Sequence, residues 1–178
     1  MPNARRMPAL ALLFSAAVLL VAVSGRGDTP APRADGAQEV TVLGVVMSPQ
    51  TGVPAVVLQG RRDGRTVAIS IGPAEATGIA FPLAKRTPPR PLTHDLFLTL
   101  FGRLDVTVSR VVITDLRDDI YYAMLHLVAR GESVALDTRP SDAIALAIRA
   151  GAPVLVEDRV FEKSERVPAP PPAAGPRI

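Results

Sequence analysis

The fold class that the sequence predicts is α+β: a single domain over residues 39–162, made of a duplicated unit of three strands and one helix (βββα), with an amphipathic helix between the two copies. Two observations predict it. Hydrophobic residues make up 48% of the 178 residues, which is enough to build one buried core. In addition, glycines, prolines and apolar runs recur 67 positions apart, as Pro73 and Pro140 do.

The repeat keeps its register over both copies without a gap. At the same shift, Gly64 corresponds to Gly131 and Glu75 corresponds to Asp142. Identical residues are few, but turns, strand runs and helix starts stay aligned, which chance similarity rarely achieves. The two copies, 39–83 and 106–150, are therefore predicted to superpose.

The first copy contains three β-branched or apolar runs that are separated by turn residues, a pattern typical of strands. These runs are 40–47, 53–58 and 65–71. Pro73 then begins a helix that continues to about Leu83, because a proline at the first helical position loses no needed hydrogen bond.

The second copy repeats this order, with strands predicted over 106–114, 120–129 and 132–138. A helix follows from Pro140 to Ala150, and Gly151 is expected to end it in a left-handed conformation. A last short strand is predicted over 153–156.

The segment between the copies predicts a further helix, which begins near Leu92 with Thr93 as the N-cap. Its leucines recur every four positions and predict one buried face that packs on the sheet. This face comprises Leu92, Leu96, Leu100 and Leu104, with Phe97 and Phe101 beside them. The strand residues 43–46 are apolar on both faces, so the sheet is expected to be covered on both sides or buried in a homo-oligomer.

The ends of the chain differ from the domain in composition. Arg5 and Arg6 precede an apolar run over 9–23, which is the layout of a signal peptide and short of the length that spans a bilayer comfortably. Residues 1–24 are predicted to be a cleaved signal peptide or an uncleaved membrane anchor, the only membrane contact of an exported or tethered protein. A flexible linker is predicted over 25–38 and a proline-rich disordered tail over 163–178.

The composition also excludes several kinds of chemistry. The chain has no cysteine, which excludes disulfides, thiol catalysis and cysteine-ligated zinc. The net charge is +3, yet acidic residues slightly outnumber basic ones from 38 to 162, so the domain lacks the basic character of proteins held on phosphates. The sequence has no phosphate-binding glycine loop, nucleophile elbow or paired-histidine metal motif.

Two histidines are available to carry protons at neutral pH. His126 lies within a predicted strand, where a structural role is favoured. His94 lies in the first turn of the predicted middle helix, next to Asp95, and either catalysis or a capping and packing role fits this place.

Carboxylates gather at the predicted helix starts and turns. Glu75 and Asp142 each follow a helix-opening proline by two residues, where the helix dipole favours a negative charge. Asp137, Arg139 and Asp142 crowd one strand-to-helix junction, and two carboxylates with an arginine can hold a divalent metal such as magnesium against a phosphate. A third group, Asp115, Asp118 and Asp119, is explained by turn chemistry.

Three stretches together resemble the bifunctional nuclease domain family of bacteria and plants: 71–76, 90–96 and 137–147. The resemblance covers nearly the whole domain and implies nuclease activity on RNA and DNA, without catalytic residues that can be carried over. The chain departs from the family pattern in its export segment and at Asp118-Asp119, where Asp-Gly is common and a left-handed aspartate is now required.

Two functions follow from these observations. The first is a nuclease that acts on RNA or DNA, in which His94 or Asp95 activates water, Arg139 meets the phosphorane charge, and Asp137 with Asp142 holds a divalent metal. The helix starts at His94 and Asp142 are then expected to line one pocket. The alternative is a non-catalytic module of the same fold that binds a partner or small ligand.

Overall fold

The structure is a computed structural model, and it describes residues 36–48 and 51–165. The predicted export segment and most of the predicted linker and tail lie outside these ranges, so export and tethering stay predictions. Within the described residues, none of the helices combines the length and the apolar character needed to cross a bilayer.

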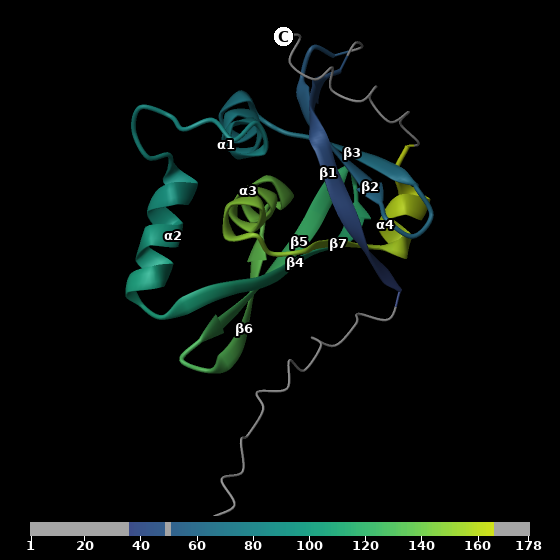
Figure 1. The fold of residues 1–178 in the computed structure, drawn as a ribbon. Helices are drawn as coiled ribbons and strands as arrows, with labels where there is room; N and C mark the ends of the chain where they lie inside the picture. Colours follow the sequence, from purple (N-terminus) through teal and green to yellow (C-terminus); the bar gives the residue numbers. More distant parts are fainter. Residues whose placement is uncertain (1–35, 49–50, 166–178) are drawn as a thin grey trace, which may run out of the picture. The chain divides into compact units, whose positions relative to one another are not determined.

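Within the described residues, seven strands form one mixed sheet. Figure 1 shows how the strands and helices are arranged. Their order across the sheet is β3-β2-β1-β7-β4-β5-β6. The strands are β1 (Ala37–Met47), β2 (Pro54–Gly60), β3 (Thr66–Ser70), β4 (Val106–Arg117), β5 (Ile120–Ala129), β6 (Glu132–Thr138) and β7 (Val154–Glu157). β7 pairs with β1 in antiparallel and with β4 in parallel orientation, and it thereby joins the two three-stranded halves.

Four helices accompany the sheet: α1 (Pro73–Leu83), α2 (Thr93–Arg103), α3 (Pro140–Ala150) and α4 (Asp158–Lys163). Pro73 and Pro140 begin α1 and α3, as predicted, and each proline follows the third strand of its half. Gly151 ends α3 with a φ of 67°, which confirms the left-handed cap. The mixed α+β fold is thus confirmed, whereas superposition of the two halves stays a prediction.

The turn between β4 and β5 is made by two aspartates. Asp118 and Asp119 have φ values of 48° and 61°, so both adopt the left-handed conformation that the sequence led us to expect of one aspartate here. Two successive positive φ angles match the right-handed twist of a hairpin. This turn brings the start of β5 close to the end of β3, and the Tyr121 hydroxyl lies 3.3 Å from the Ala68 carbonyl oxygen.

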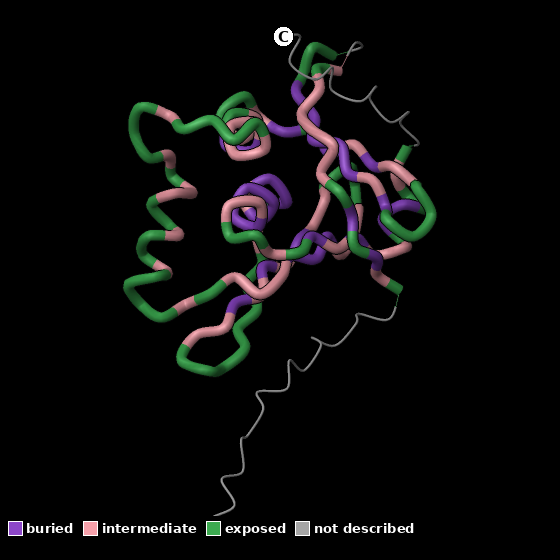
Figure 2. Tube along the Cα trace, viewed as in Figure 1, coloured by how far each residue is buried: buried purple, intermediate pink, exposed green. Residues whose placement is uncertain are grey.

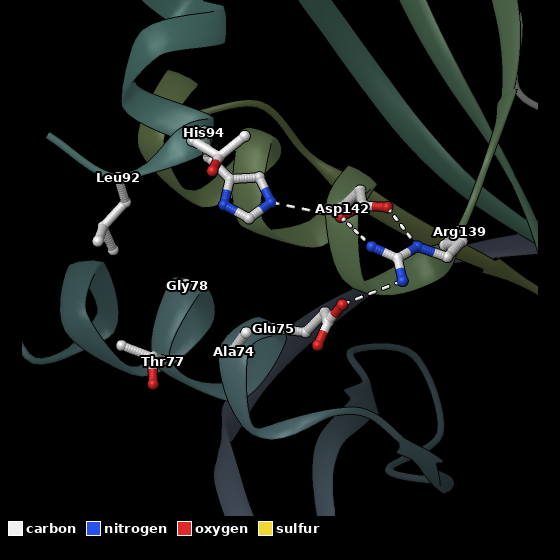
Figure 3. Close-up of a pocket in the computed structure, with 9 residues that line it drawn as sticks. Ala74, Glu75, Thr77, Gly78, Leu92, His94, Arg139 and Asp142 are labelled. Atoms are coloured by element: carbon white, nitrogen blue, oxygen red, sulfur yellow. Dashed lines mark hydrogen bonds and ion pairs between the residues drawn. The ribbon is translucent and has the colours of Figure 1, made fainter.

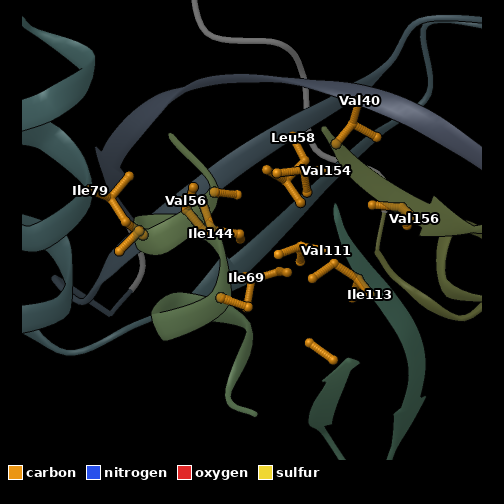
Figure 4. Packing of buried hydrophobic residues seen from close by; sticks show 14 of the residues in the cluster. Val40, Val56, Leu58, Ile69, Ile79, Val111, Ile113, Ile144, Val154 and Val156 are labelled. Atoms are coloured by element: carbon orange, nitrogen blue, oxygen red, sulfur yellow. The ribbon is translucent and has the colours of Figure 1, made fainter. Parts of the chain in front are cut away.

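One hydrophobic core lies between the sheet and α3 (Figure 4). Strands from both halves contribute to it, as Val56, Val111 and Val156 do. The small residues Ala143, Ala145 and Ala147 are fully buried and let α3 pack closely on the strands, with Ile144 between them. Because α3 is fixed in this way, the residues at its first turn have a defined position.

Helix α2 corrects one prediction. Most of the predicted buried face is exposed: Leu96 is 66% exposed, and Phe97, Leu100 and Leu104 are also exposed in the described part of the chain. Figure 2 shows exposed and half-buried stretches along α2. Of the predicted face, Phe101 packs against the core, and Leu98, which was not assigned to that face, packs there too. The periodicity identified an apolar stripe, but the helix contacts the domain through only part of it. Thr93 is the first helical residue, and Leu92 takes the N-cap position predicted for it.

Candidate functional site

The starts of three helices surround one cavity of about 360 Å³ (Figure 3). Helix α1 contributes Glu75, α2 contributes His94, and α3 contributes Asp142 with its N-cap Arg139. The remaining lining residues are Ala74, Thr77, Gly78, Leu92 and Thr93. The structure therefore brings His94, Arg139 and Asp142 together at one cavity.

Arg139 binds both carboxylates of the cavity. Its Nε lies 2.7 Å from Oδ2 of Asp142 and its Nη2 lies 3.0 Å from Oδ1, a bidentate pair. Its Nη1 lies 3.0 Å from Oε1 of Glu75. A guanidinium has five N–H groups, so about two remain for a ligand. Arg139 thus joins the first turns of α1 and α3.

His94 faces the same carboxylate from the opposite side. Its Nε2 lies 3.5 Å from Oδ1 of Asp142. Gly78 in α1 leaves room for the imidazole ring: a Cβ atom on this glycine would lie 2.9 Å from Cε1 of His94. The absence of a side chain at residue 78 therefore allows the ring to stand against α1 and point at Asp142.

The neighbouring side chains, mainly Arg139, keep the Asp142 carboxyl group ionised. Burial alone raises the pKa of its carboxyl group, but the hydrogen bond and charge of Arg139, with a smaller contribution from His94, lower that pKa below its ordinary value of 3.8. The hydrogen bonds that Arg139 donates to Asp142, together with the charge of that carboxylate, in turn raise the pKa of the Arg139 guanidinium. At neutral pH the cavity thus holds an Asp142 carboxylate that accepts hydrogen bonds from Arg139 and lies beside the His94 imidazole.

Asp95 is next to His94 in the sequence but does not line the cavity. Successive residues of a helix point about 100° apart, and the Asp95 carboxylate faces Arg149. Oδ1 of Asp95 lies 2.6 Å from Nε of Arg149, and Oδ2 accepts the backbone N–H of Leu92 at 2.7 Å. Asp95 therefore holds the start of α2 in place, which positions its neighbour His94.

The predicted metal pair is not assembled. Asp137 is an exposed residue of β6 and does not line the cavity. Asp142 and Glu75 already bind Arg139, and residues 36–48 and 51–165 contain no group of three ligating side chains arranged for a metal ion. The residues present at this cavity thus fit a divalent metal poorly.

Other polar candidates lie elsewhere. His126 is half-buried on β5, where burial and the charge of Arg110 lower its pKa. Asp115 accepts a hydrogen bond from Lys163 at 2.6 Å, which ties β4 to α4. Neither residue lines the cavity with His94. The structural role predicted for His126 agrees with its position in a strand. Asp115 was expected in the hairpin turn, but it lies on β4, which extends to Arg117.

Glu75 and Gly78 are the site residues that sequence reasoning missed. A signal for Glu75 was present, because the repeat aligns it with Asp142. Glu75 and Asp142 each lie in the first turn of a helix, and both bind the guanidinium of Arg139. No such signal existed for Gly78, whose importance depends on the approach of His94 from another helix.

This arrangement has the parts of an acid–base site. An ionised carboxylate fixes an imidazole, and an arginine with free N–H groups lies on the other side of that carboxylate. An imidazole held in this way can take a proton from water or a hydroxyl group, and an arginine can stabilise a phosphate or its transition state.

Comparison with known proteins agrees with the resemblance noted in the sequence. The family model of the bifunctional nuclease domain matches residues 56–168, which is more than half of the chain. The chain belongs to the bifunctional nuclease domain family. Every residue that lines the cavity lies inside the range matched to the bifunctional nuclease domain.

Relatives of the chain occur in bacteria and plants. An uncharacterized protein of Mycobacterium tuberculosis is 35% identical over 126 residues, which cover 71% of this chain and 75% of that protein. Bifunctional nuclease 1 of Oryza sativa subsp. japonica is 36% identical over 75 residues, or 40% of this chain and 23% of the plant protein. A bifunctional nuclease of Oryza minuta matches to the same extent.

Proposed function

We propose that this bifunctional nuclease domain hydrolyses phosphodiester bonds of RNA, DNA or both at the cavity between α1, α2 and α3. The observation that supports this proposal best is the convergence of His94, Asp142 and Arg139 on one cavity, from two helices that are far apart in the sequence. A proton acceptor, its orienting carboxylate and a cation for phosphate are the groups that such a reaction uses.

In the proposed reaction, His94 is the general base. The Asp142 carboxylate orients the imidazole and stabilises it once it is protonated. His94 takes a proton from a water molecule as the water oxygen bonds to phosphorus. The bond between phosphorus and the leaving oxygen then breaks, and that oxygen takes a proton from the solvent or from protonated His94.

Arg139 stabilises the charge on the phosphorane in this scheme. Its side chain is largely exposed at the mouth of the cavity, and it has N–H groups that neither Glu75 nor Asp142 occupies. A phosphate can therefore bind Arg139 without breaking the pairs that hold the guanidinium flat against α3. Glu75 and Asp142 position this arginine for its ligand.

Magnesium assistance stays a prediction for this reaction. The carboxylates of Glu75 and Asp142 at the cavity are paired with Arg139. The proposed reaction therefore assigns them no metal ion. A chelator in the assay tests this point: activity that survives EDTA supports the reaction by His94 and Arg139, and activity lost to EDTA and restored by magnesium supports a metal.

A non-catalytic binding module is the second candidate, and one observation favours it. The contacts of Arg139 with Glu75 and Asp142, and of His94 with Asp142, can all be explained as contacts that hold three helix starts together. In that case the cavity binds a phosphate-bearing ligand without cleaving it, and the bifunctional nuclease fold serves as a scaffold.

Cleavage of labelled RNA and single-stranded DNA by the purified full chain decides between the candidates. His94→Ala is expected to reduce the cleavage rate by about 10²- to 10⁴-fold, the usual contribution of a general base. His126→Ala is the matched control, because it removes the other histidine from a half-buried strand position away from the cavity. Equal activity of wild type and His94→Ala would reject the proposed role of His94 as the base.

A further inference from the structure

A second cavity of about 280 Å³ lies on the other side of the Arg139–Glu75 pair. It shares these two residues with the first cavity, so one ion pair separates two adjacent hollows. Its other walls come from the end of β3, the β4–β5 turn and the first turn of α3. A ligand that reaches Arg139 from one hollow can therefore extend into the other.

The second cavity differs from the first in its chemistry. Its walls include the apolar side chains of Ile71, Ile120 and Pro140, together with the ring of Tyr121. Ile120 is 57% exposed although it is a large aliphatic residue next to a tight turn. Tyr121 is half-buried, and its hydroxyl lies within hydrogen-bond distance of Ala68 and Ser164, which fixes the ring. Such a surface suits a flat, largely apolar group.

Ser141 provides one polar group of this cavity, which Ser70, Glu75, Asp119 and Arg139 also line. The residue is only 6% exposed, yet its hydroxyl has no hydrogen-bond partner within the described residues. In that same part of the chain, every side-chain oxygen or nitrogen that is sealed from solvent has a partner. The Ser141 hydroxyl is therefore accessible, and the surface it retains lies at the cavity that the residue lines. A buried hydroxyl left open to a cavity is available for a ligand.

We propose that this second cavity is a subsite for one unpaired nucleobase. The base lies against Ile71, Ile120 and Tyr121, the Ser141 hydroxyl hydrogen-bonds to its edge, and the adjacent phosphate reaches Arg139. This inference rests on the proposed function, and it specifies the substrate as single-stranded nucleic acid. A base that is paired in a duplex cannot enter unless it leaves the helical stack.

Equilibrium binding tests the subsite without requiring cleavage. The probes are a fluorescein-labelled oligothymidylate of ten nucleotides and a decamer of the same backbone in which every base is replaced by an abasic residue. Fluorescence anisotropy is measured with the full chain at constant salt, because both probes carry the same phosphates. We expect the oligothymidylate to bind at least about five-fold more tightly, since base contacts are worth ~1 kcal/mol or more.

Two variants locate this base dependence. Ser141→Ala removes one hydrogen bond and is expected to weaken binding of oligothymidylate by about 2- to 10-fold, while binding of the abasic decamer stays unchanged. Ile120→Ser, at an exposed position that tolerates substitution, is expected to act in the same way. The controls are Ser133→Ala on β6 and Leu100→Ser on α2, which change a serine and an exposed large aliphatic residue away from the cavity.

Equal affinity for the two decamers would overturn the subsite, and so would an equal loss for both decamers in Ser141→Ala, because the hydroxyl would then bind a phosphate. The outcome is separate from that of the proposed function. Base-dependent binding without cleavage supports the subsite and rejects the nuclease, whereas cleavage without base-dependent binding supports the nuclease and rejects the subsite.

Discussion

The two arginines at the ends of α3 meet the solvent in different ways. Arg139, the N-cap, has a side chain that is 66% exposed and binds Glu75 and Asp142 at the edge of the cavities. Arg149, in the last turn, is 8% exposed. It binds Asp95 of α2 and donates to the carbonyl of Gly78 in α1 at 2.6 Å. Arg139 therefore connects α1 and α3 at the surface, whereas Arg149 connects α1, α2 and α3 inside the domain.

This difference separates two tasks that the same residue type performs. A buried arginine that is bound to several helices fixes their relative positions, because breaking its contacts leaves a charge unpaired in the interior. An exposed arginine adds little to stability, since water replaces its partners readily. Arg139 is consequently the arginine that can bind a ligand. Arg149 instead fixes the positions of the helices around His94.

The largest expected effect is on stability. Arg149→Ala is expected to lower the free energy of unfolding by about 3 kcal/mol, because Asp95 and the Gly78 carbonyl lose their partner. Arg139→Ala, the matched change at the other end of α3, is expected to lower it by less than about 1 kcal/mol. Urea unfolding followed by circular dichroism measures both. A similar loss of unfolding free energy in the two variants would contradict the conclusion that Arg149 stabilises the fold and Arg139 does not.

The second effect is on activity. Arg139→Gln is expected to reduce cleavage of single-stranded DNA or RNA by about 10²-fold or more, as removal of a group that stabilises transition-state charge does. Its fold should persist, since the lost ion pairs are exposed. Single-turnover cleavage rates give the activity, and the urea experiment gives the stability. A variant with full activity would remove Arg139 from the proposed reaction.

The third effect concerns the pH dependence of the buried contact. Burial alone raises the pKa of Asp95, but Arg149 and the Leu92 N–H lower it below 3.8. A carboxyl group whose pKa is lower in the folded state stabilises the protein above pH 3.8, and this contribution is lost as the pH falls through the folded value. The stability gap between wild type and Asp95→Asn is expected to be constant at neutral pH and to shrink below about pH 4. A gap that is as large at pH 3 as at pH 7 would contradict this.

The smallest effect is expected on the outer side of α2. If Arg149 and the inward side chains hold this helix, Leu100→Ala should change the free energy of unfolding by less than about 0.5 kcal/mol. Leu98→Ala, two residues away on the side that packs on the core, should lower it by about 1 kcal/mol or more. Thermal and urea unfolding of the pair compare the two sides.

Local chemistry predicted the elements that have clear boundaries. The bounds predicted for α3 and for strands β5 and β6 agree with the structure. Proline at the start and glycine at the end of α3 act through their own backbone angles, so no knowledge of distant residues was needed. Helix α4 was missed because six residues are too few to show a helical period, and its burial depends on tertiary contacts of Val160 and Phe161.

Contacts between distant segments limited the prediction of the site. His94 and Asp142 were expected at one pocket from their places at two helix starts, and the structure brings them together. Asp95 was assigned to the same pocket, but it faces Arg149, which is 54 residues away in the sequence. The orientation of α2 was wrong for the same reason, because periodicity identifies a stripe without its partner. The roles of these residues in catalysis stay predictions.

The place of β7 in the sheet has a consequence for the order of folding. Only this four-residue strand, Val154–Glu157, lies between β1 and β4, although both halves of the sheet precede it in the chain. During synthesis, each half can pair its own three strands as soon as they emerge, because those hairpins are local. The sheet becomes continuous only after β7 has inserted, so the last strand within the described residues is the one that unites the fold.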